Sequence, residues 1–417
     1  MTGPLAGEVA RFLPETDHGP LGIAVSGGSD SLALLLLVSE IWPARDLAAV
    51  TVDHGLRPES GGEARVVGDI CKELGIDHEV LRWQGWDGKG NLQERARRAR
   101  YALMAGWAHG RGIGGIALGH TLDDQAETVL MRLARGSGVD GLSAMAPRST
   151  RDGMLWLRPM LTLRRQELRD HLTARGLRWV DDPSNDDRRF DRVRVRAAMA
   201  ALEELGIGAG ALAAVAGRMQ AAREVLESQV AETAGSIARP DAGAVVLQAD
   251  GFRALPDEIA RRLLRQALRF VSGSIHGPRH APLELMLGSL RQGRGATVDG
   301  CQSVVARGAI WIFREYEAVR SLVCPADHLW DGRWRAQNAS AGSRESSELE
   351  LRALGPAGLS HCPDWRETGR PRTALLASPA IWRGDALVAA PFAGRPGGWT
   401  IRDETPTGSF VCTGKSH

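Results

Sequence analysis

The chain has 417 residues, of which 43% are hydrophobic and 24% charged. This composition excludes wholesale disorder, and the length predicts two or three globular domains. Its 52 basic and 50 acidic residues give a formal net charge of +2, which by itself indicates no polyanionic partner. The 5 cysteines form no C-x-x-C pair, which argues against a disulfide scaffold, a zinc ribbon and a dithiol redox site. No apolar run approaches the roughly 20 residues that cross a bilayer, and no secretory pattern begins the chain, so we expect a cytoplasmic protein without a membrane partner.

Along the first 135 residues, short apolar segments alternate with helical ones, which is typical of a parallel sheet covered on both faces. The expected strands are 22–25, 47–52, 79–83 and 113–118. The expected helices are 31–41, 62–74, 92–109 and 122–133. The fold class predicted for this segment is therefore α/β, with a doubly wound parallel sheet.

The remaining chain has a different pattern. Loop and extended chain are expected over 147–159, a helix over 164–175, a turn over 181–185, alanine-rich helix over 197–237, an amphipathic helix over 257–271 and a hairpin over 296–313. Beyond residue 322 the chain is rich in proline and glycine, with short strands at 349–351 and 386–388. We expect an α/β catalytic domain over 1–200, a helical second domain ending in the hairpin over 201–320, and a small β-rich C-terminal domain over 321–417.

A glycine- and serine-rich loop lies between the first strand and the first helix. Its residues are Ser26, Gly27, Gly28, Ser29, Asp30 and Ser31. Glycines let the backbone approach a ligand closely, and a helix N-terminus offers unpaired N–H groups to phosphate. Because no lysine follows the glycines, this is not a Walker loop. The string S-G-G-x-D-S resembles the pyrophosphate loop (PP-loop) of the N-type ATP pyrophosphatases, which implies that it cradles the pyrophosphate leaving ATP and that Asp30 binds Mg²⁺.

Two further groups of polar residues follow strand ends. Asp53 and His54 end the second strand, where ligands of open parallel sheets bind; they could contact a nucleotide or form a capping turn. His120, Asp124 and Glu127 follow the fourth strand and enter a helix, and the two acids, three apart, share one helical face. First-turn acids also simply stabilise a helix dipole. Paired carboxylates at the rim of a phosphate loop would suit the amine of a cationic substrate.

Together these motifs resemble the tRNA(Ile)-lysidine synthetase family. The motifs are S-G-G-x-D-S, D-H-G-L-R at 53–57 and G-H-x-x-D-D-Q-x-E-T at 119–128. The resemblance extends to Asn91 and the run A-R-R-A-R-Y at 96–101, to R-P-M at 158–160 and to W-V-D-D-P-S-N at 179–185, so that it covers residues 20–200 tightly. Later segments, 295–315 and 379–391, are similar more loosely.

The resemblance implies a function. The family uses ATP to adenylate the C2 oxygen of the wobble cytidine in the isoleucine tRNA with a CAU anticodon. The ε-amine of free lysine then displaces AMP, which gives lysidine and decoding of AUA. The resemblance further implies that Asp30 holds Mg²⁺, Arg97 neutralises the polyphosphate in the transition state, Asp124 and Glu127 bind lysine, and His120 is an orienting or acid–base group.

An arginine-rich run follows the turn at 181–185 and is expected to contact the tRNA. Its arginines are Arg188, Arg189, Arg192, Arg194 and Arg196. Arginines beside an aromatic residue suit an RNA backbone and an unstacked base. The sequence departs from the family pattern at Val193, where an asparagine is expected, and this puts any polar contact of that position in doubt. The family also implies that the later domains help to recognise the acceptor arm.

Alternative functions differ in what they require. A PP-loop tRNA thiolase shares the adenylation but relies on paired cysteines or an iron–sulfur cluster, whereas the α/β segment holds only Cys71. An amidotransferase-type ligase such as a GMP synthetase would not need the acidic helix or the arginine run. A catalytically inactive RNA-binding protein would not need Asp30, His120 and the two acids. The sequence leaves open whether the chain forms a homodimer and which tRNA bases outside the anticodon are read.

Overall fold

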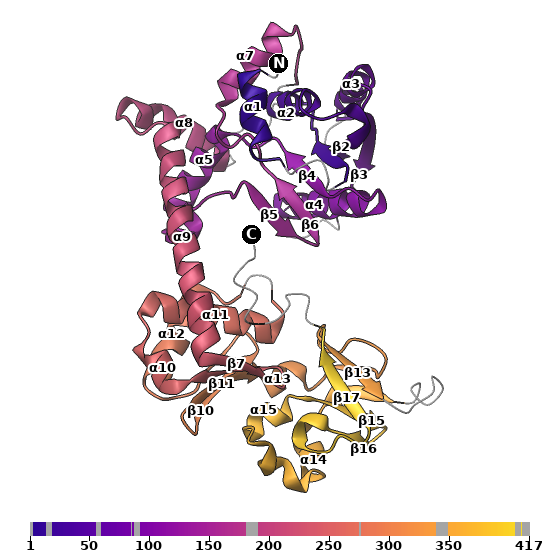
Figure 1. The fold of residues 1–417 in the computed structure, drawn as a ribbon, viewed down its shortest axis with the longest axis vertical. Helices are drawn as coiled ribbons and strands as arrows, with labels where there is room; N and C mark the ends of the chain where they lie inside the picture. The colour runs from indigo at the N-terminus through magenta and orange to yellow at the C-terminus, as the bar shows by residue number, and fades with distance from the viewer. Residues whose placement is uncertain are drawn as a thin grey trace. The chain divides into compact units, whose positions relative to one another are not determined.

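The computed structural model describes residues 3–13, 19–55, 60–84, 86, 92–180, 191–274, 277–338, 349–404 and 410. The chain divides into two compact units, one over residues 1–224 with 416–417 and the other over residues 225–415 (Figure 1). The finer division into three domains at 200 and 320 stays a prediction.

The first unit is built on a six-stranded sheet in the order β3-β2-β1-β4-β6-β5. Its strands are β1 (Leu21–Ala24), β2 (Leu47–Asp53), β3 (Asp77–Arg82), β4 (Gly115–Leu118), β5 (Arg148–Arg151) and β6 (Met154–Leu157). All pairings are parallel except that of β5 with β6. In the register, Ile23 of β1 lies between Ala49 of β2 and Ala117 of β4. The strand order reverses at β1, so the α/β prediction is confirmed and the switch point lies beside the glycine-rich loop.

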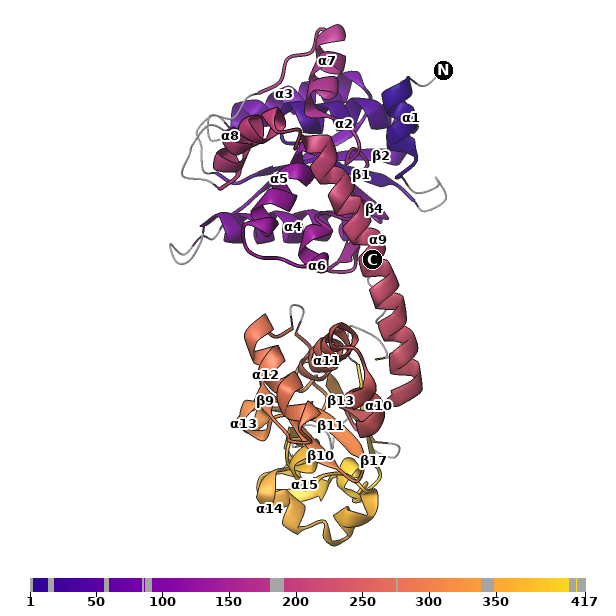
Figure 2. The same cartoon turned by 90° about the vertical axis from the view of Figure 1, so that its left-hand side faces the viewer.

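Helices cover both faces of this sheet, as Figure 2 shows with α2 and α3 on one side and α4 on the other. The helices are α1 (Pro4–Ala10), α2 (Ser29–Ser39), α3 (Ser60–Glu73), α4 (Leu92–Gly110), α5 (Leu122–Leu133), α6 (Val139–Leu142), α7 (Arg165–Ala174) and α8 (Asp191–Glu204), with a 3-10 turn η2 (Ala44–Asp46). On one face, Leu34 of α2 and Leu172 of α7 are fully buried in a common core. On the other face, Met104 of α4 packs with Ile116 of β4. From Leu32 to Val38, helix α2 is apolar on every side, as expected for a helix enclosed by its neighbours.

The extended chain that the sequence predicts over 147–159 is regular structure. Its strands β5 and β6 form a hairpin that extends the sheet beyond β4. The hairpin turns at Asp152 and Gly153, whose φ angles are 54° and 72°. Asp-Gly is a favoured pair for a two-residue turn in which both residues have positive φ.

The alanine-rich stretch at 197–237 forms parts of two helices, α8 and α9 (Ala209–Ile237), instead of one. The chain breaks at Gly206, where φ is 78°, a conformation that glycine adopts without strain. The two helices meet at 102°. No single helix in the described ranges is long and apolar enough to cross a membrane; α8 and α9 reach that length and composition only as a pair.

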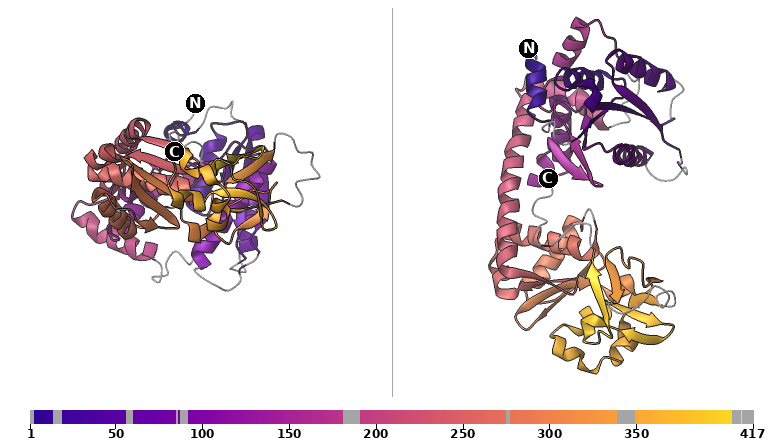
Figure 3. Two further views of the ribbon diagram at one scale, coloured as in Figure 1. Left: turned by 90° about the horizontal axis from the view of Figure 1, so that it is seen from below. Right: turned by 45° about the vertical axis from the view of Figure 1, so that its right-hand side comes forward.

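The described residues of the second unit form three smaller sheets, in the orders β7-β8-β11-β10-β9, β12-β14-β15-β16 and β13-β17. Figure 3 shows this unit in two further views. Its elements are β7 (Ala238–Asp241), β8 (Ala244–Gln248), α10 (Ala249–Ala254), α11 (Asp257–Ser272), α12 (His280–Arg291), β9 (Thr297–Val298), β10 (Cys301–Ala306), β11 (Ala309–Arg314), α13 (Tyr316–Val319), β12 (Val323–Pro325), β13 (Trp334–Asn338), β14 (Glu350–Ala353), α14 (Gly355–Ser360), η5 (Pro363–Thr368), α15 (Arg372–Leu376), β15 (Pro379–Arg383), β16 (Ala386–Ala389), η6 (Pro391–Ala393) and β17 (Trp399–Asp403). The expected hairpin is confirmed as β10 and β11, and the amphipathic helix at 257–271 as α11, whose Leu263 and Leu264 are fully buried.

Candidate active site

The polar motifs follow the ends of three adjacent strands, β1, β2 and β4, which are parallel to one another. The carboxyl ends of parallel strands lie at one edge of a sheet, and this is where open α/β sheets bind their ligands. The three motifs therefore open onto the same edge.

The glycine-rich loop is held by its own serine hydroxyls. The Ser26 N–H donates to Ser31 Oγ at 3.0 Å, and that hydroxyl in turn donates to the Gly28 carbonyl at 3.0 Å. Gly27 has a φ of 87°, which glycine alone adopts readily, and Gly28 is the N-cap of α2. The loop is thus fixed at the N-terminus of an 11-residue helix, where N–H groups are available to an anion.

The residue that follows β4 is a glycine, Gly119, and it lies against this loop. A Cβ atom on Gly119 would lie 3.0 Å from the Cα and the N of Ser31 and 3.1 Å from the carbonyl carbon of Asp30. These are backbone atoms at the start of α2, so they cannot rotate away. Gly119 therefore allows the end of β4 to pack directly against the phosphate loop.

Asp124 is buried and held by the start of α5. Its Oδ2 accepts hydrogen bonds from the Thr121 N–H at 2.9 Å and from Thr121 Oγ1 at 3.0 Å. The Asp124 N–H in turn donates to Thr121 Oγ1 at 3.3 Å, which completes a capping box. Burial alone raises the pKa of Asp124, but the nearby Arg165, the hydrogen bonds and other positive charges outweigh it and lower the pKa below its ordinary value. Asp124 is therefore ionised near neutral pH.

Glu127 lies one helical turn further on, and its side chain is only 3% exposed. Its Oε1 accepts a hydrogen bond from Arg196 Nε at 2.6 Å, and Arg192 Nε lies 3.9 Å from Oε2. Glu127 Oε2 is buried and accepts no hydrogen bond from any described residue. The carboxylate therefore keeps one acceptor oxygen without a donor inside a charged site.

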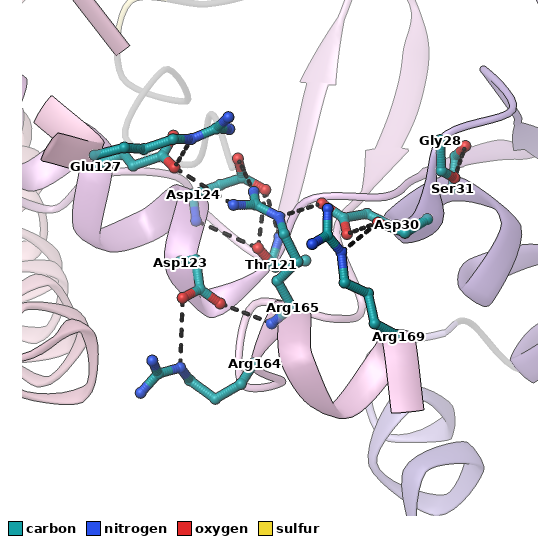
Figure 4. Close-up of polar contacts among 12 residues, drawn as sticks. Gly28, Asp30, Ser31, Thr121, Asp123, Asp124, Glu127, Arg164, Arg165 and Arg169 are labelled. Carbon is teal, nitrogen blue, oxygen red and sulfur yellow. Dashed lines mark hydrogen bonds and ion pairs between the residues drawn. The ribbon is translucent and has the colours of Figure 1, made fainter. Parts of the chain in front are cut away.

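A residue with no role in the sequence analysis joins these carboxylates. Arg165, at the start of α7, reaches Asp30 through Nε at 2.9 Å, Asp124 through Nη2 at 3.1 Å and Glu127 through Nη1 at 3.6 Å (Figure 4). Burial alone would lower the pKa of Arg165, but these carboxylates outweigh it and raise the pKa above its usual value. Arg165 therefore stays charged.

His120 is buried beside Asp124. Burial, reinforced by the positive charges of Arg158, Arg100 and Arg192, lowers the pKa of His120 to about 3, although Asp124 opposes the shift. Its Nδ1 is buried and has no hydrogen-bond partner in the described part of the chain. His120 is therefore a neutral imidazole at physiological pH.

The residues after β2 adopt different roles. Asp53 Oδ1 accepts a hydrogen bond from the Gly55 N–H at 2.9 Å, so it caps its own turn. The His54 ring packs edge-on against Trp83 with centroids 5.9 Å apart. Burial and the charge of Arg100 lower the pKa of His54, which keeps it neutral.

Arg97 is exposed on α4, and its guanidinium lies 5.4 Å from the centre of the Tyr101 ring. Arg100, one turn further along the same helix, is the arginine whose charge acts on both His54 and His120. The charge of Arg100 therefore acts on both imidazoles, which the spacing of Arg97 and Arg100 along the sequence could not indicate.

Of the arginine run, three residues are described, all on α8. Arg192 and Arg196 contact Glu127, whereas Arg194 forms an ion pair with Asp191. Arg188 and Arg189 lie outside the described residues, as do Arg57, Asn91 and the expected turn at 181–185.

A sequence signal for Arg165 does exist. Two arginines, Arg164 and Arg165, stand where α7 begins, and a helix N-terminus disfavours cations. Such a pair indicates carboxylates nearby. Here Asp123 supplies one of them, since it accepts the Arg165 N–H at 2.7 Å and lies 3.4 Å from Arg164 Nε.

Comparison with known proteins agrees with this geometry. Residues 1–203 match the PP-loop domain family. The chain is 47% identical over 399 residues to the tRNA(Ile)-lysidine synthase of Ruegeria pomeroyi, covering 95% of this chain and 94% of that protein. It is 38% identical over 398 residues to the enzyme of the same name from Brucella canis, covering 88% and 85%. Among solved structures, the U34-tRNA thiolase NcsA from Methanococcus maripaludis with its 4Fe-4S cluster has a TM-score of 0.44 at 18% identity, covering 52% of this chain and 77% of that chain, a similarity too distant to bear on function.

The similarity to the Ruegeria protein covers 95% of this chain and therefore extends into both compact units. The chain belongs to the tRNA(Ile)-lysidine synthase family of PP-loop, ATP-dependent ligases.

Proposed function

We propose that this chain joins free L-lysine to C2 of the wobble cytidine in the isoleucine tRNA with a CAU anticodon. In the first step the C2 oxygen attacks the α-phosphorus of ATP, and pyrophosphate leaves. In the second step the lysine ε-amine, after losing a proton, attacks C2, and AMP leaves with the oxygen. The observation that carries the proposal is the meeting of a phosphate loop and two buried carboxylates at one edge of the sheet in a member of this family.

The phosphate loop supports the ATP half of the reaction. We assign Ser26, Gly27, Gly28, Ser29 and Ser31 to the ATP phosphates, because these residues frame the N-terminus of α2 and its free N–H groups. Ser31 is already committed to the loop through the Gly28 carbonyl and the Ser26 N–H, so the loop needs little reordering to receive an anion. His54 suits a nucleotide contact as a neutral ring, whereas the hydrogen bond of Asp53 to its own turn favours a supporting role.

Asp30 fits a Mg²⁺ ion that arrives with ATP. No group of three or more His, Cys, Asp or Glu side chains that could hold a metal lies among the described residues. Mg²⁺ does not require one, because it keeps several waters and is usually bound by one or two carboxylates and substrate phosphates. Asp30 is the acid in the first turn of α2, next to the loop. A bound Mg²⁺ would neutralise charge on the phosphates that leave as pyrophosphate.

Asp124 and Glu127 suit the lysine ammonium. Both are buried, and both already pair with guanidinium groups, so they lie in a cation-binding environment. The Oε2 of Glu127, which has no donor among the described residues, is an acceptor that an ammonium would satisfy. A buried carboxylate oxygen without a donor is costly in a structural role, so a ligand-binding role explains it better.

His120 would act as an acceptor in this site. Because its pKa is about 3, it carries no proton to donate as an imidazolium near neutral pH. A neutral imidazole beside Asp124 can orient the lysine amine or accept a hydrogen bond from it. Arg97 is retained as the group that would neutralise the polyphosphate, with Arg100 as a second cation on the same helix.

The exposed arginines of α8 are proposed to contact the tRNA. The side chains of Arg192 and Arg194 are 43% and 63% exposed, so they can reach a phosphate, while Arg196 is 35% exposed. Because Arg192 and Arg196 also pair with Glu127, they would link tRNA contact to the carboxylate that we assign to the lysine ammonium. Arg188 and Arg189 belong to the same proposed interface on sequence grounds.

The cysteines favour lysine transfer over the thiolase alternative. Cys71 is fully buried in the core of the α/β unit, and burial raises its pKa to about 11, which opposes formation of the thiolate that sulfur chemistry requires. Transfer of sulfur from sulfide to the tRNA in the absence of lysine would favour the thiolase instead.

The proposal is tested by following pyrophosphate and AMP separately in the presence of ATP, Mg²⁺ and an isoleucine-tRNA transcript. We expect pyrophosphate to form without lysine and AMP to form rapidly only when lysine is added. Asp30→Ala should abolish both products while the protein still folds, which circular dichroism would check. Release of AMP that depends on sulfide and ignores lysine would overturn the proposal.

A further inference from the structure

One guanidinium holds three carboxylates that the proposed function gives to two different cations. Arg165 Nε lies 2.9 Å from Asp30, the proposed Mg²⁺ ligand. Its Nη2 and Nη1 lie 3.1 Å and 3.6 Å from Asp124 and Glu127, the proposed lysine ligands. Each nitrogen takes a different carboxylate, so Arg165 spans both subsites at once (Figure 4).

The position of Arg165 is fixed from behind. Its backbone N–H donates to Asp123 Oδ2 at 2.7 Å, which ties the start of α7 to α5. Helix α7 is anchored further along by Leu168 and Leu172, both fully buried in the core shared with α2. The guanidinium, by contrast, is held by ion pairs, and the side chain is 20% exposed. The helix is therefore rigidly placed while the charged end can exchange partners.

The bound cations would compete with Arg165 for the same oxygens. A Mg²⁺ ion on Asp30 would compete with Arg165 Nε for Oδ2, which is the oxygen not already hydrogen-bonded to Ser29 Oγ at 3.0 Å. A lysine ammonium on Asp124 would likewise compete with Arg165 for Oδ1, because Oδ2 already accepts a hydrogen bond from the Thr121 N–H. In this structure Arg165, Arg192 and Arg196 already pair with these carboxylates, so an added cation would compete with Arg165 for the oxygens that it contacts.

We propose that Arg165 is a positioning residue that couples the metal and lysine subsites by exchanging with their cations. When a divalent ion takes Asp30, Arg165 loses its Nε partner and its hold on Asp124 and Glu127 weakens, so lysine binds more tightly. By linkage, lysine must raise the affinity for the divalent ion by the same factor. This inference rests on the proposed function for the identity of the two subsites.

Arg164 provides a matched control. It precedes Arg165 on the same helix start, but its guanidinium pairs with Asp123 at 3.4 Å, an acid outside the set of three carboxylates that Arg165 spans. A tether that merely holds α7 in place would be weakened in either variant. Exchange with the two cations is specific to Arg165.

The experiment measures Mn²⁺ binding by electron paramagnetic resonance to the full-length protein saturated with a non-hydrolysable ATP analogue, with and without lysine. In the wild type and in Arg164→Gln, lysine should tighten Mn²⁺ binding about tenfold. In Arg165→Gln, Mn²⁺ should bind about tenfold tighter without lysine, and lysine should change the affinity less than about twofold. Arg165→Lys, which keeps one charge but cannot span three carboxylates, should show a reduced lysine effect.

Three results would overturn the inference: wild-type Mn²⁺ affinity that ignores lysine, an Arg165→Gln variant that behaves as the wild type, or one that binds Mn²⁺ more weakly. Should Arg165→Gln fail to fold by circular dichroism, Arg165→Lys decides the question, and a full lysine effect in that variant contradicts the coupling. Incorporation of labelled lysine into tRNA by the wild type separates the two proposals. If incorporation proceeds while the Mn²⁺ results fail, only the coupling is wrong; if lysine is not incorporated, the proposed function is wrong as well.

Discussion

Glu127→Gln tests the lysine subsite while keeping the shape of the side chain. The carboxylate is 3% exposed and surrounded by Arg196 at 2.6 Å, Arg165 at 3.6 Å and Arg192 at 3.9 Å, with Oε2 free of donors among the described residues. The amide removes the negative charge and one charge-assisted hydrogen bond to the lysine ammonium, worth about 1.5–3 kcal/mol. We therefore expect the KM for lysine to rise about ten- to hundredfold, with a smaller change in the KM for ATP.

The assay is the steady-state rate of lysine transfer to the tRNA transcript as lysine is varied at saturating ATP. Asp123→Asn is the matched control, because Asp123 lies on the same helix and is 23% exposed, yet it pairs with Arg164 and the backbone of α7. Its KM for lysine should stay within about twofold of the wild type, since the asparagine oxygen still accepts the Arg165 N–H and the ligand keeps all of its partners. A Glu127→Gln enzyme with an unchanged KM for lysine would refute the assignment of Glu127.

Three further predictions concern the rest of the site. The pKa of His120 is about 3 in the folded protein against 6.5 in the unfolded chain, so between these values only the unfolded chain takes up a proton and stability falls as pH drops. From this residue the free energy of unfolding should fall by about 1.4 kcal/mol for each pH unit below 6.5. Denaturant titrations at about pH 7, 6 and 5 measure this slope, and His120→Gln should remove it. Gly119→Ala would place a Cβ 3.0 Å from backbone atoms at the start of α2, so calorimetry should show ATP binding weakened and melting curves a loss of about 1–3 kcal/mol, whereas wild-type values would contradict the tight packing. Arg192→Ala combined with Arg194→Ala should weaken tRNA binding and lower the slope of log affinity against log salt by about 0.7–0.9 for each phosphate that is no longer neutralised. The control is Arg65→Ala, because Arg65 is an exposed arginine on α3, and this variant should keep the wild-type slope. An unchanged slope in the double variant would remove α8 from the interface.

Much of the α/β unit follows from its sequence because its signals are local. Apolar runs of strand length alternate with helical segments, and the expected helix over 122–133 coincides with α5. The pairing of β5 with β6 as a hairpin was not predicted, because β5 (Arg148–Arg151) is mostly exposed and carries no alternation of apolar and polar residues. The Asp152–Gly153 turn was the available signal. The break before α9 was not predicted because alanine favours helix on both sides of it, although Gly206, Gly208 and Gly210 were the available signal.

The site could be predicted where its residues are neighbours in sequence or directly follow the ends of parallel strands. Asp124 and Glu127 are three apart, so their common face follows from helical geometry. Arg165 lies 41 residues from Asp124 and 135 from Asp30, and its ion pairs depend on how α7 packs against α2 and α5. Likewise, the spacing of Arg97 and Arg100 along α4 could not indicate which of them would act on His120, because this depends on the rotation of that helix against the sheet.

The most direct test of the proposed function is incorporation of labelled lysine into an isoleucine-tRNA transcript with a CAU anticodon, in the presence of ATP and Mg²⁺. A transcript with uridine in place of the wobble cytidine and a methionine-tRNA transcript serve as controls. We expect label to enter the isoleucine transcript alone, with one AMP released for each lysine transferred. AMP release without lysine uptake, or equal labelling of the methionine transcript, would contradict lysine transfer to this tRNA.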